Sequence, residues 1–199
     1  VRGMAATAFG GRNLGEAADV FEAMVRDRDC FRVLTISGAM TIAKQGLVVC
    51  EMIDRGWVQA IVATGALMTH GFVEAAGMTH YKHRPSMNDE ELFAKGYNRV
   101  YDTLELEQNL DDTEKIVSAV LDGVPEGTVL ASHVITEALG RHLEAHADGR
   151  AILKSAVAHG VPVYIPAFTD SELGLDVAVY NRRREMAGKV RRAFDPFLD

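Results

Sequence analysis

Short apolar runs alternate with amphipathic segments along this chain. Three runs are rich in β-branched and other apolar residues, and they cover residues 31–36, 58–63 and 161–166. Runs of this length and composition predict buried strands, and each is followed by a turn of small residues. Segments of helical period follow the first two turns, which predicts strand–turn–helix units with right-handed crossovers. We therefore expect an α/β fold with a doubly wound, mostly parallel sheet and helices on both faces.

The amphipathic segments predict the helices between these strands. Asn13 and Glu16 have the spacing of a capping box, which predicts a helix over residues 14–27. Further helices are expected over 41–55, 88–95, 113–121, 132–142 and 150–159, with Asp111 and Asp112 as the cap of the helix over 113–121. Residues 80–87 predict a loop, and residues 100–104 predict a short strand. No repeat or linker divides the sequence, so we expect a single domain over residues 1–199.

Composition narrows the class of protein. The 199 residues carry a formal net charge of −7, which argues against a general nucleic-acid binder. Two cysteines are too few for a disulfide framework and fit a reducing compartment, so we expect a cytoplasmic protein. No apolar run is long enough for a transmembrane helix, and no secretory leader is visible. Because the chain starts at Val1 and stops in an amphipathic run, we expect the natural protein to extend beyond both ends.

The turns after the predicted strands are candidate ligand sites. They are Ser37–Thr41, Ala63–Ala66 and Thr169–Ser171, all rich in small and hydroxyl residues. In an open parallel sheet, ligands bind beyond the carboxyl ends of the strands. Small residues let backbone N–H groups approach a phosphate, which favours a dinucleotide site, although such residues also make ordinary tight turns. Neither a G-x-G-x-x-G sequence nor a P-loop sequence is present, so any nucleotide is held by a different set of turns.

Histidines supply further candidates. His142 and His146 have the i, i+4 spacing of zinc ligands, but a solvated helix face explains them better, and we expect no metal site. His80 and His83 lie in the polar loop, where we favour plain surface positions over active-site positions. His70 follows the second small-residue turn, where a site role and a structural role are equally compatible with the pattern.

The third turn is specific enough to place the chain in a family. The stretch Ile165–Gly174, I-P-A-F-T-D-S-E-L-G, resembles the P-A-[LF]-T-D-x-x-L-G segment of the deoxyhypusine synthase family. Ala63–Ala66 stands where that family has its T-A-G-G turn, with a similar strand before it. Phe21, Met24 and the segment 36–46 also follow the order and spacing of the family, so the resemblance extends over nearly the whole chain.

This resemblance implies a Rossmann-like fold, a homotetramer and NAD bound near a subunit interface. The family oxidises spermidine with NAD and passes the aminobutyl group, through an imine on an enzyme lysine, to a lysine of the hypusine-bearing translation initiation factor. Positions that match NAD contacts in the family are Met40, Thr41, Ala63, Thr64, Gly65 and Asp170.

The chain departs from the family pattern at the amine site. Met68-Thr69-His70 replaces the paired acids after the T-A-G-G turn, and Leu175 replaces an aspartate, with Asp176 one place later. A polyamine site needs carboxylates, since buried ammonium groups must be paired. Glu74, Glu172 and Asp176 are possible replacements, and we expect His70, Glu172 and Asp176 to contact the substrate.

The family's catalytic lysine follows a glycine-rich turn that is missing here. The lysines of this chain are Lys44, Lys82, Lys95, Lys115, Lys154 and Lys189, and none has that context. The expected activity is that of a divergent, bacterial-type deoxyhypusine synthase-like protein. Two alternatives are transfer to a free diamine such as putrescine, giving homospermidine, and a non-catalytic NAD-binding protein.

Asp170 has two interpretations. It follows the third strand directly, so its carboxylate is placed to face a ligand beyond the sheet. Aspartate is also favoured as a helix N-cap, and Glu172 and Leu173 could begin a helix. The resemblance favours the ligand site.

Overall fold

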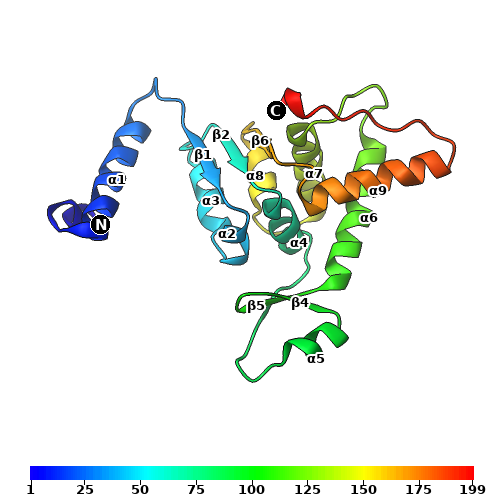
Figure 1. The fold of residues 1–199 in the computed structure, drawn as a ribbon. Coiled ribbons are helices and arrows are strands. Elements are labelled where there is room, and N and C mark those ends of the chain that lie inside the picture. The colour runs from blue at the N-terminus through cyan, green and yellow to red at the C-terminus, as the bar shows by residue number, and fades with distance from the viewer.

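The principal sheet is parallel and has three strands (Figure 1). The computed structural model describes residues 1–199, apart from the side chain of Arg2. The strands are β1 (Val33–Ile36), β2 (Ala60–Ala63) and β6 (Val163–Tyr164), in the spatial order β1-β2-β6. Each lies within a predicted apolar run, so the mostly parallel, Rossmann-like α/β fold is confirmed. The strands are shorter than those runs because the ladder begins only where Val33 pairs with Ala60.

The two faces of this sheet differ in burial. Register places Leu34 beside Ile61, and Ile61 beside Val163, so these side chains share one face. That face belongs to the main hydrophobic core, together with residues of α3 (Gly46–Asp54) and α8 (Ile152–Ala158). On the other face Val33 is 49% exposed. The helices therefore pack most densely against one side of the sheet.

The predicted helices form, with three differences at their ends. In α1 (Phe9–Arg26), Asn13 lies inside the helix and Ala8 is the N-cap, so the predicted capping box is wrong. The segment predicted as one helix over 41–55 is α2 (Ala39–Ile42) and α3, separated by Lys44 at a φ of 61°. Asp111 and Asp112 lie within α6 (Glu107–Gly123) and do not cap it.

The helices that follow β2 pack on the sheet and on one another. After β2 come the π-helical turn η2 (Leu67–Gly71) and the short helix α4 (Phe72–Ala75). The long helix α7 (Ser132–His146) packs on α8 and β6, and α9 (Glu172–Met186) packs on α6. The 3-10 turns η1 (Arg2–Ala6) and η3 (Pro196–Leu198) lie near the two ends of the chain. Within the described residues, no helix is long and apolar enough to cross a membrane.

A second, antiparallel sheet projects below the principal one in Figure 1. Its strands are β3 (Tyr81–Lys82), β4 (Tyr97–Val100) and β5 (Thr103–Leu106), in the order β3-β5-β4. The strand predicted over 100–104 is wrong in its bounds, because Tyr101 and Asp102 form the turn of a hairpin. Helix α5 (Asp89–Ala94) begins as predicted at Asn88, whose side chain accepts a hydrogen bond from Glu90 N.

Candidate functional site

The turns after β1 and β2 are locked together. Gly38 N donates a hydrogen bond of 2.8 Å to Thr64 Oγ1, and Thr41 Oγ1 donates one of 2.6 Å to Gly38 O. A Cβ atom on Gly38 would lie 2.1 Å from the backbone nitrogen of Leu67. Glycine is thus required at position 38, because the two turns approach more closely than any side chain allows.

The turn after β6 joins the same edge. A Cβ on Gly65 would lie 2.0 Å from Ser171 Cβ, so the second and third turns also touch. Ser171 is the N-cap of α9 and accepts a hydrogen bond from Gly174 N. The N-cap interpretation of Asp170 is therefore wrong, and the Asp170 side chain is exposed beside the cap.

The six predicted NAD positions divide into two groups at this edge. Thr41, Ala63 and Gly65 are buried and hold the turns in place. Met40, Thr64 and Asp170 are exposed around them. The N-terminus of α9, which favours negative charge, starts from the third turn. Small turns, exposed polar side chains and a helix N-terminus are a set that could hold a dinucleotide, while the assignment of each residue to NAD stays a prediction.

Two of the predicted substrate residues lie together beside this edge. Glu172 and Asp176, one turn apart on α9, line a narrow cleft of about 10 Å³ with Met68 and Thr69 of η2. Burial of Asp176, and the neighbouring carboxylates Glu172 and Glu114, raise the pKa of Asp176 to about 7.

Glu114 of α6 was not singled out from the sequence. It forms an ion pair with Arg183, with Nη1 2.6 Å from Glu114 Oε1. Two carboxylates, Glu172 and Glu114, thus lie close enough to Asp176 to oppose its ionisation, and Glu114 is itself paired with Arg183.

His70, the third predicted substrate residue, belongs to a different cluster. Its Nδ1 atom lies 2.9 Å from Glu105 Oε2. His80 joins from the other side, with Nδ1 2.9 Å from Glu74 Oε1 and Nε2 3.4 Å from Glu105 Oε1. The His80 side chain is only 1% exposed, so its predicted surface position is wrong.

The electrostatics of this cluster centre on Glu105. Burial alone would raise the pKa of Glu105, but the hydrogen bonds and positive charge of His70 and His80 outweigh it and lower that pKa to about 2. Of the side chains that the structure describes, His70, His80 and Glu105 form the one group of three suited to holding a metal ion. The pair predicted to be a plain helix face, His142 and His146, stacks ring on ring with centroids 4.3 Å apart on α7.

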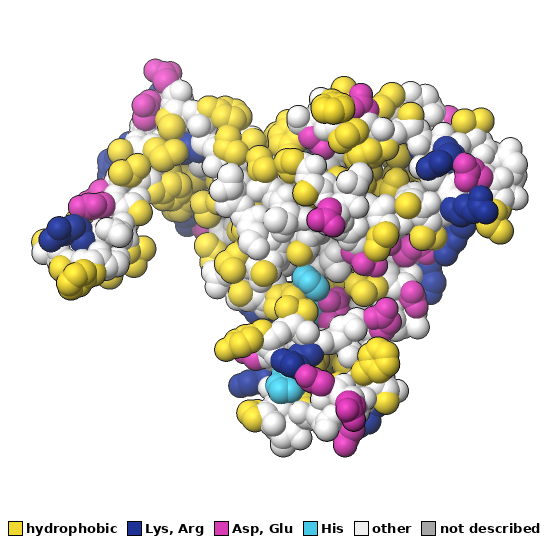
Figure 2. Space-filling model, viewed as in Figure 1, with side chains coloured by type: hydrophobic (Ala, Val, Ile, Leu, Met, Phe, Trp, Pro, Cys, Tyr) yellow, Lys and Arg dark blue, Asp and Glu magenta, His cyan; other side chains and the backbone are white. Residues whose placement is uncertain are grey.

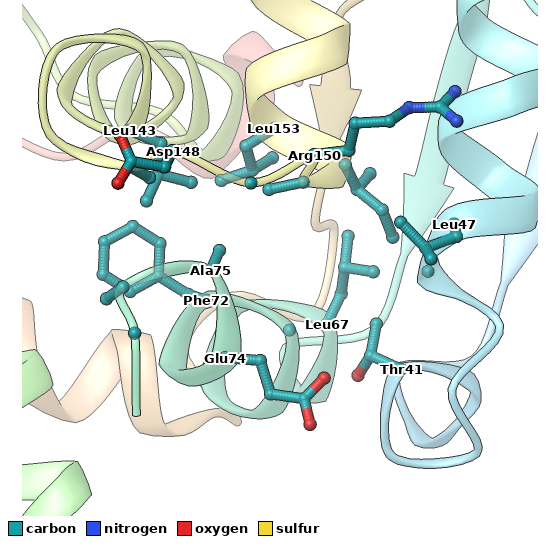
Figure 3. A pocket seen from close by; sticks show the side chains of 18 of the residues that line it. Thr41, Leu47, Leu67, Phe72, Glu74, Ala75, Leu143, Asp148, Arg150 and Leu153 are labelled. Carbon is teal, nitrogen blue, oxygen red and sulfur yellow. The ribbon is translucent and has the colours of Figure 1, made fainter. Parts of the chain in front are cut away.

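Glu74 connects this cluster to a cavity. The cavity has a volume of about 550 Å³ and lies between α2, α3, α4 and the loop joining α7 to α8. Figure 3 shows Glu74 pointing from α4 into the space beside Thr41. Glu74 forms an ion pair with Lys44, and burial lowers the pKa of Lys44. Because Glu74 contacts both Lys44 and His80, it is a committed carboxylate rather than a free replacement for the family's paired acids.

Comparison with known proteins gives a consistent result. A sequence model of deoxyhypusine synthase matches residues 1–199. "Probable deoxyhypusine synthase 1" of Methanosarcina mazei is 36% identical over 199 residues, which are 100% of this chain and 62% of that protein. "Deoxyhypusine synthase-like protein" of Chlorobaculum parvum is 32% identical over 176 residues, which are 87% of this chain and 50% of that protein.

A solved structure shares the fold. A crystal structure reported as that of "a putative deoxyhypusine synthase from Entamoeba histolytica" superposes with a TM-score of 0.69 at 15% identity, and the match covers 96% of this chain and 64% of that one. The chain thus spans roughly half to two thirds of the length of the relatives it matches. With a family match over its entire length, the chain belongs to the deoxyhypusine synthase family.

Proposed function

We propose that this chain forms the NAD-binding part of an aminobutyl transferase of the deoxyhypusine synthase type. The donor is spermidine, and the acceptor is a lysine of the hypusine-bearing translation initiation factor. Family membership supports aminobutyl transfer in general. We infer the cofactor and the substrates from two neighbouring features. One is the set of turns at the carboxyl ends of β1, β2 and β6, which we call the strand edge, and the other is the cleft beside Asp176.

The first feature is the set of turns that could hold NAD. Thr64 and Asp170 offer a hydroxyl and a carboxylate at the exposed rim, and Met40 offers an apolar side chain. The interlocked turns behind them keep these groups in place without flexible loops. When bound, NAD supplies the hydride acceptor for oxidation of the amine. The residues of this chain bind and orient it.

The burial of Asp176 beside Glu172 and Glu114 is the observation that carries the proposal. At neutral pH a carboxyl group with a pKa of about 7 is only half ionised, because burial and two neighbouring carboxylates oppose its charge, and a bound cation would relieve that opposition. A polyamine ammonium group arriving beside Asp176 would favour the carboxylate, lower its pKa and release a proton. A neutral ligand would do neither.

The proposal also covers the catalytic lysine, the assembly and the cellular location of the protein. None of the six lysines stands in the glycine-rich context of the family's nucleophile, so we propose that the lysine which carries the aminobutyl group lies outside residues 1–199. Assembly as a homotetramer and a cytoplasmic location belong to the same proposal.

Labelled spermidine tests the proposed transfer directly. The full-length protein is incubated with NAD and spermidine labelled in its aminobutyl part, together with either the initiation factor or putrescine. We expect label on the initiation factor, and we expect Asp176→Asn to reduce labelling because the amine loses its carboxylate. Glu137→Gln, on the exposed face of α7, is the matched control and should leave labelling unchanged.

Two other outcomes would replace the proposal. Labelled homospermidine without labelled protein would make a free diamine the acceptor, which the replacement of the paired acids by Met68-Thr69-His70 would then explain. Binding of NAD without any product would make the protein a non-catalytic NAD binder.

A further inference from the structure

Three metal-binding side chains meet where the antiparallel sheet joins the parallel-sheet body. His70 comes from η2, His80 from the segment before β3, and Glu105 from β5. Their ligand atoms all lie within 4.8 Å of one another. The side chains of His80 and Glu105 are 1% and 3% exposed, and that of His70 is 18% exposed. The cluster is therefore buried, and only the side of His70 reaches the surface. Figure 2 shows histidine and acidic side chains close together on one face of the molecule.

Hydrogen bonding fixes which nitrogen of His80 carries a proton. The Glu74 carboxylate, paired with Lys44, can only accept a hydrogen bond, so His80 Nδ1 donates to it. Nε2 of the same ring faces Glu105 Oε1, 3.4 Å away. Both atoms are buried, and neither has a hydrogen-bond partner among the described residues. Buried polar atoms are costly to leave unpaired, and a cation between this nitrogen and this oxygen would satisfy both.

We propose that His70, His80 and Glu105 bind a divalent transition-metal ion, with Zn²⁺ as the best match. Two imidazoles and one carboxylate form a ligand set that suits Zn²⁺, whereas Mg²⁺ and Ca²⁺ prefer oxygen ligands alone. Glu74 acts as a positioning residue, because a carboxylate on the far nitrogen of a ligating histidine orients its ring. The partly exposed side of His70 leaves a fourth position open to water.

Such a metal ion would join two parts of the fold. Glu105 belongs to the antiparallel sheet, while His70 belongs to η2, whose Met68 and Thr69 line the cleft of Glu172 and Asp176. The ion would hold β5 against η2 and so fix one wall of that cleft. None of the three ligands matches a NAD position of the family, and one of them, His70, is also a residue expected to contact the amine substrate.

Metal analysis of the full-length protein tests this site. The protein is stripped with a chelator, dialysed against Zn²⁺ or Co²⁺, and analysed for bound metal and for the visible absorption of Co²⁺. We expect one ion per chain, a Co²⁺ spectrum of low coordination number, and a higher melting temperature with Zn²⁺ than without. Wild-type protein that binds neither ion would overturn the proposal, and would leave a proton shared between His80 and Glu105 as the occupant.

Variants locate the ion within the molecule. His80→Ala and Glu105→Gln should abolish binding, and Glu74→Gln should weaken it by about 10–100-fold, as loss of a carboxylate behind a ligand does. The matched control replaces both His142 and His146 with alanine and should bind as tightly as wild type. If the control loses the ion while His80→Ala retains it, the ion belongs to α7 and the proposal fails. Metal binding by the wild-type protein tests the proposal without any variant, so the proposal can fail even if a variant does not fold.

Discussion

The strand edge and the histidine–glutamate cluster are built in opposite ways. At the strand edge, short turns touch through glycine backbones, and the polar side chains that remain are exposed. In the cluster, long polar side chains from separate segments are buried and contact one another directly. The strand edge therefore depends on the small size of its glycine residues. A ligand can reach its exposed polar side chains without rearranging the core. The cluster depends on the contacts among its buried side chains, and each of its members is costly to remove.

The largest effect is expected at the centre of the cluster. Glu105→Ala should lower the free energy of unfolding by about 3–5 kcal/mol, because it leaves buried imidazoles without their shared acceptor. Chemical denaturation of both proteins at pH 7 measures this loss. Glu137→Ala, which breaks an exposed pair with Arg141, should change stability by less than about 1 kcal/mol. Equal losses for the two variants would contradict the distinction between the two regions.

The next effect depends on pH and comes from Asp176. Its pKa is about 7 in the folded protein against 3.8 in the unfolded chain, so the folded state binds more protons between these values. Stability should therefore fall as pH rises from about 4 to about 7, by up to roughly 1.4 kcal/mol per pH unit. Asp176→Asn should remove this slope, whereas the exposed Asp19→Asn should keep it. Denaturation at several pH values in this window measures the slope.

Glu105 contributes with the opposite sign in a lower range of pH. Its folded pKa of about 2 lies below the ordinary value of 4.5, so its stabilising contribution is present above that value and is lost as pH falls through the folded pKa. The two carboxylates can thus be separated by pH alone. A stability that rises from pH 4 to pH 7 in wild type, and rises equally in Asp176→Asn, would contradict the assignment to Asp176.

A smaller loss is expected where the turns touch. Gly65→Ala places a methyl group where Ser171 Cβ lies 2.0 Å away, so the second and third turns must separate. Overpacking of this kind costs about 1–3 kcal/mol. Gly123→Ala, at the end of α6 with nothing within 4 Å of the added Cβ, is the control and should be close to neutral. Thermal unfolding measures both variants. Equal melting temperatures for Gly65→Ala and Gly123→Ala would contradict the close contact between the second and third turns.

The same contrast explains what could be predicted from the sequence. The strand edge follows from local patterns, since an apolar β-branched run and the small turn after it are consecutive in the chain. Gly38, Thr64 and Gly65 can therefore be placed in turns at the carboxyl ends of the strands from the sequence alone. The contact of Gly65 with Ser171 requires β6 to lie beside β2, and the sequence pattern predicts parallel strands without specifying that order.

The cluster could not be predicted in this way. His70 and Glu105 are 35 positions apart and come together only because the β4–β5 hairpin folds back on η2. A strand predicted over 100–104 includes the hairpin turn at Tyr101 and Asp102, so that prediction does not place Glu105 on the inward side. His80 lies in a loop with polar neighbours, a pattern that predicts an exposed side chain rather than a buried one. A glutamate flanked by two leucines in a short strand, Leu104 and Leu106, was the one local sign of a buried charge.

The helix ends show a related limit. Asn13, Asp111 and Asp112 have the composition of caps, yet each lies inside a longer helix. A residue type that is favourable as a cap does not by itself end a helix, because the neighbouring residues can continue the helical backbone past it. Asn88 and Ser171 do cap their helices, and each side chain accepts a hydrogen bond from a backbone N–H of the first turn.

Calorimetric titration of NAD into the full-length protein and its Asp170→Ala variant tests the central claim most directly. Asp170 is exposed and Ser171 caps α9, so the melting temperature without NAD should stay the same. NAD affinity should fall by about 1.5–3 kcal/mol, the range for a hydrogen bond to a charged group. An unchanged NAD affinity, whatever the melting temperature, would show that Asp170 does not contact NAD. It would contradict the strand edge as the place where NAD binds.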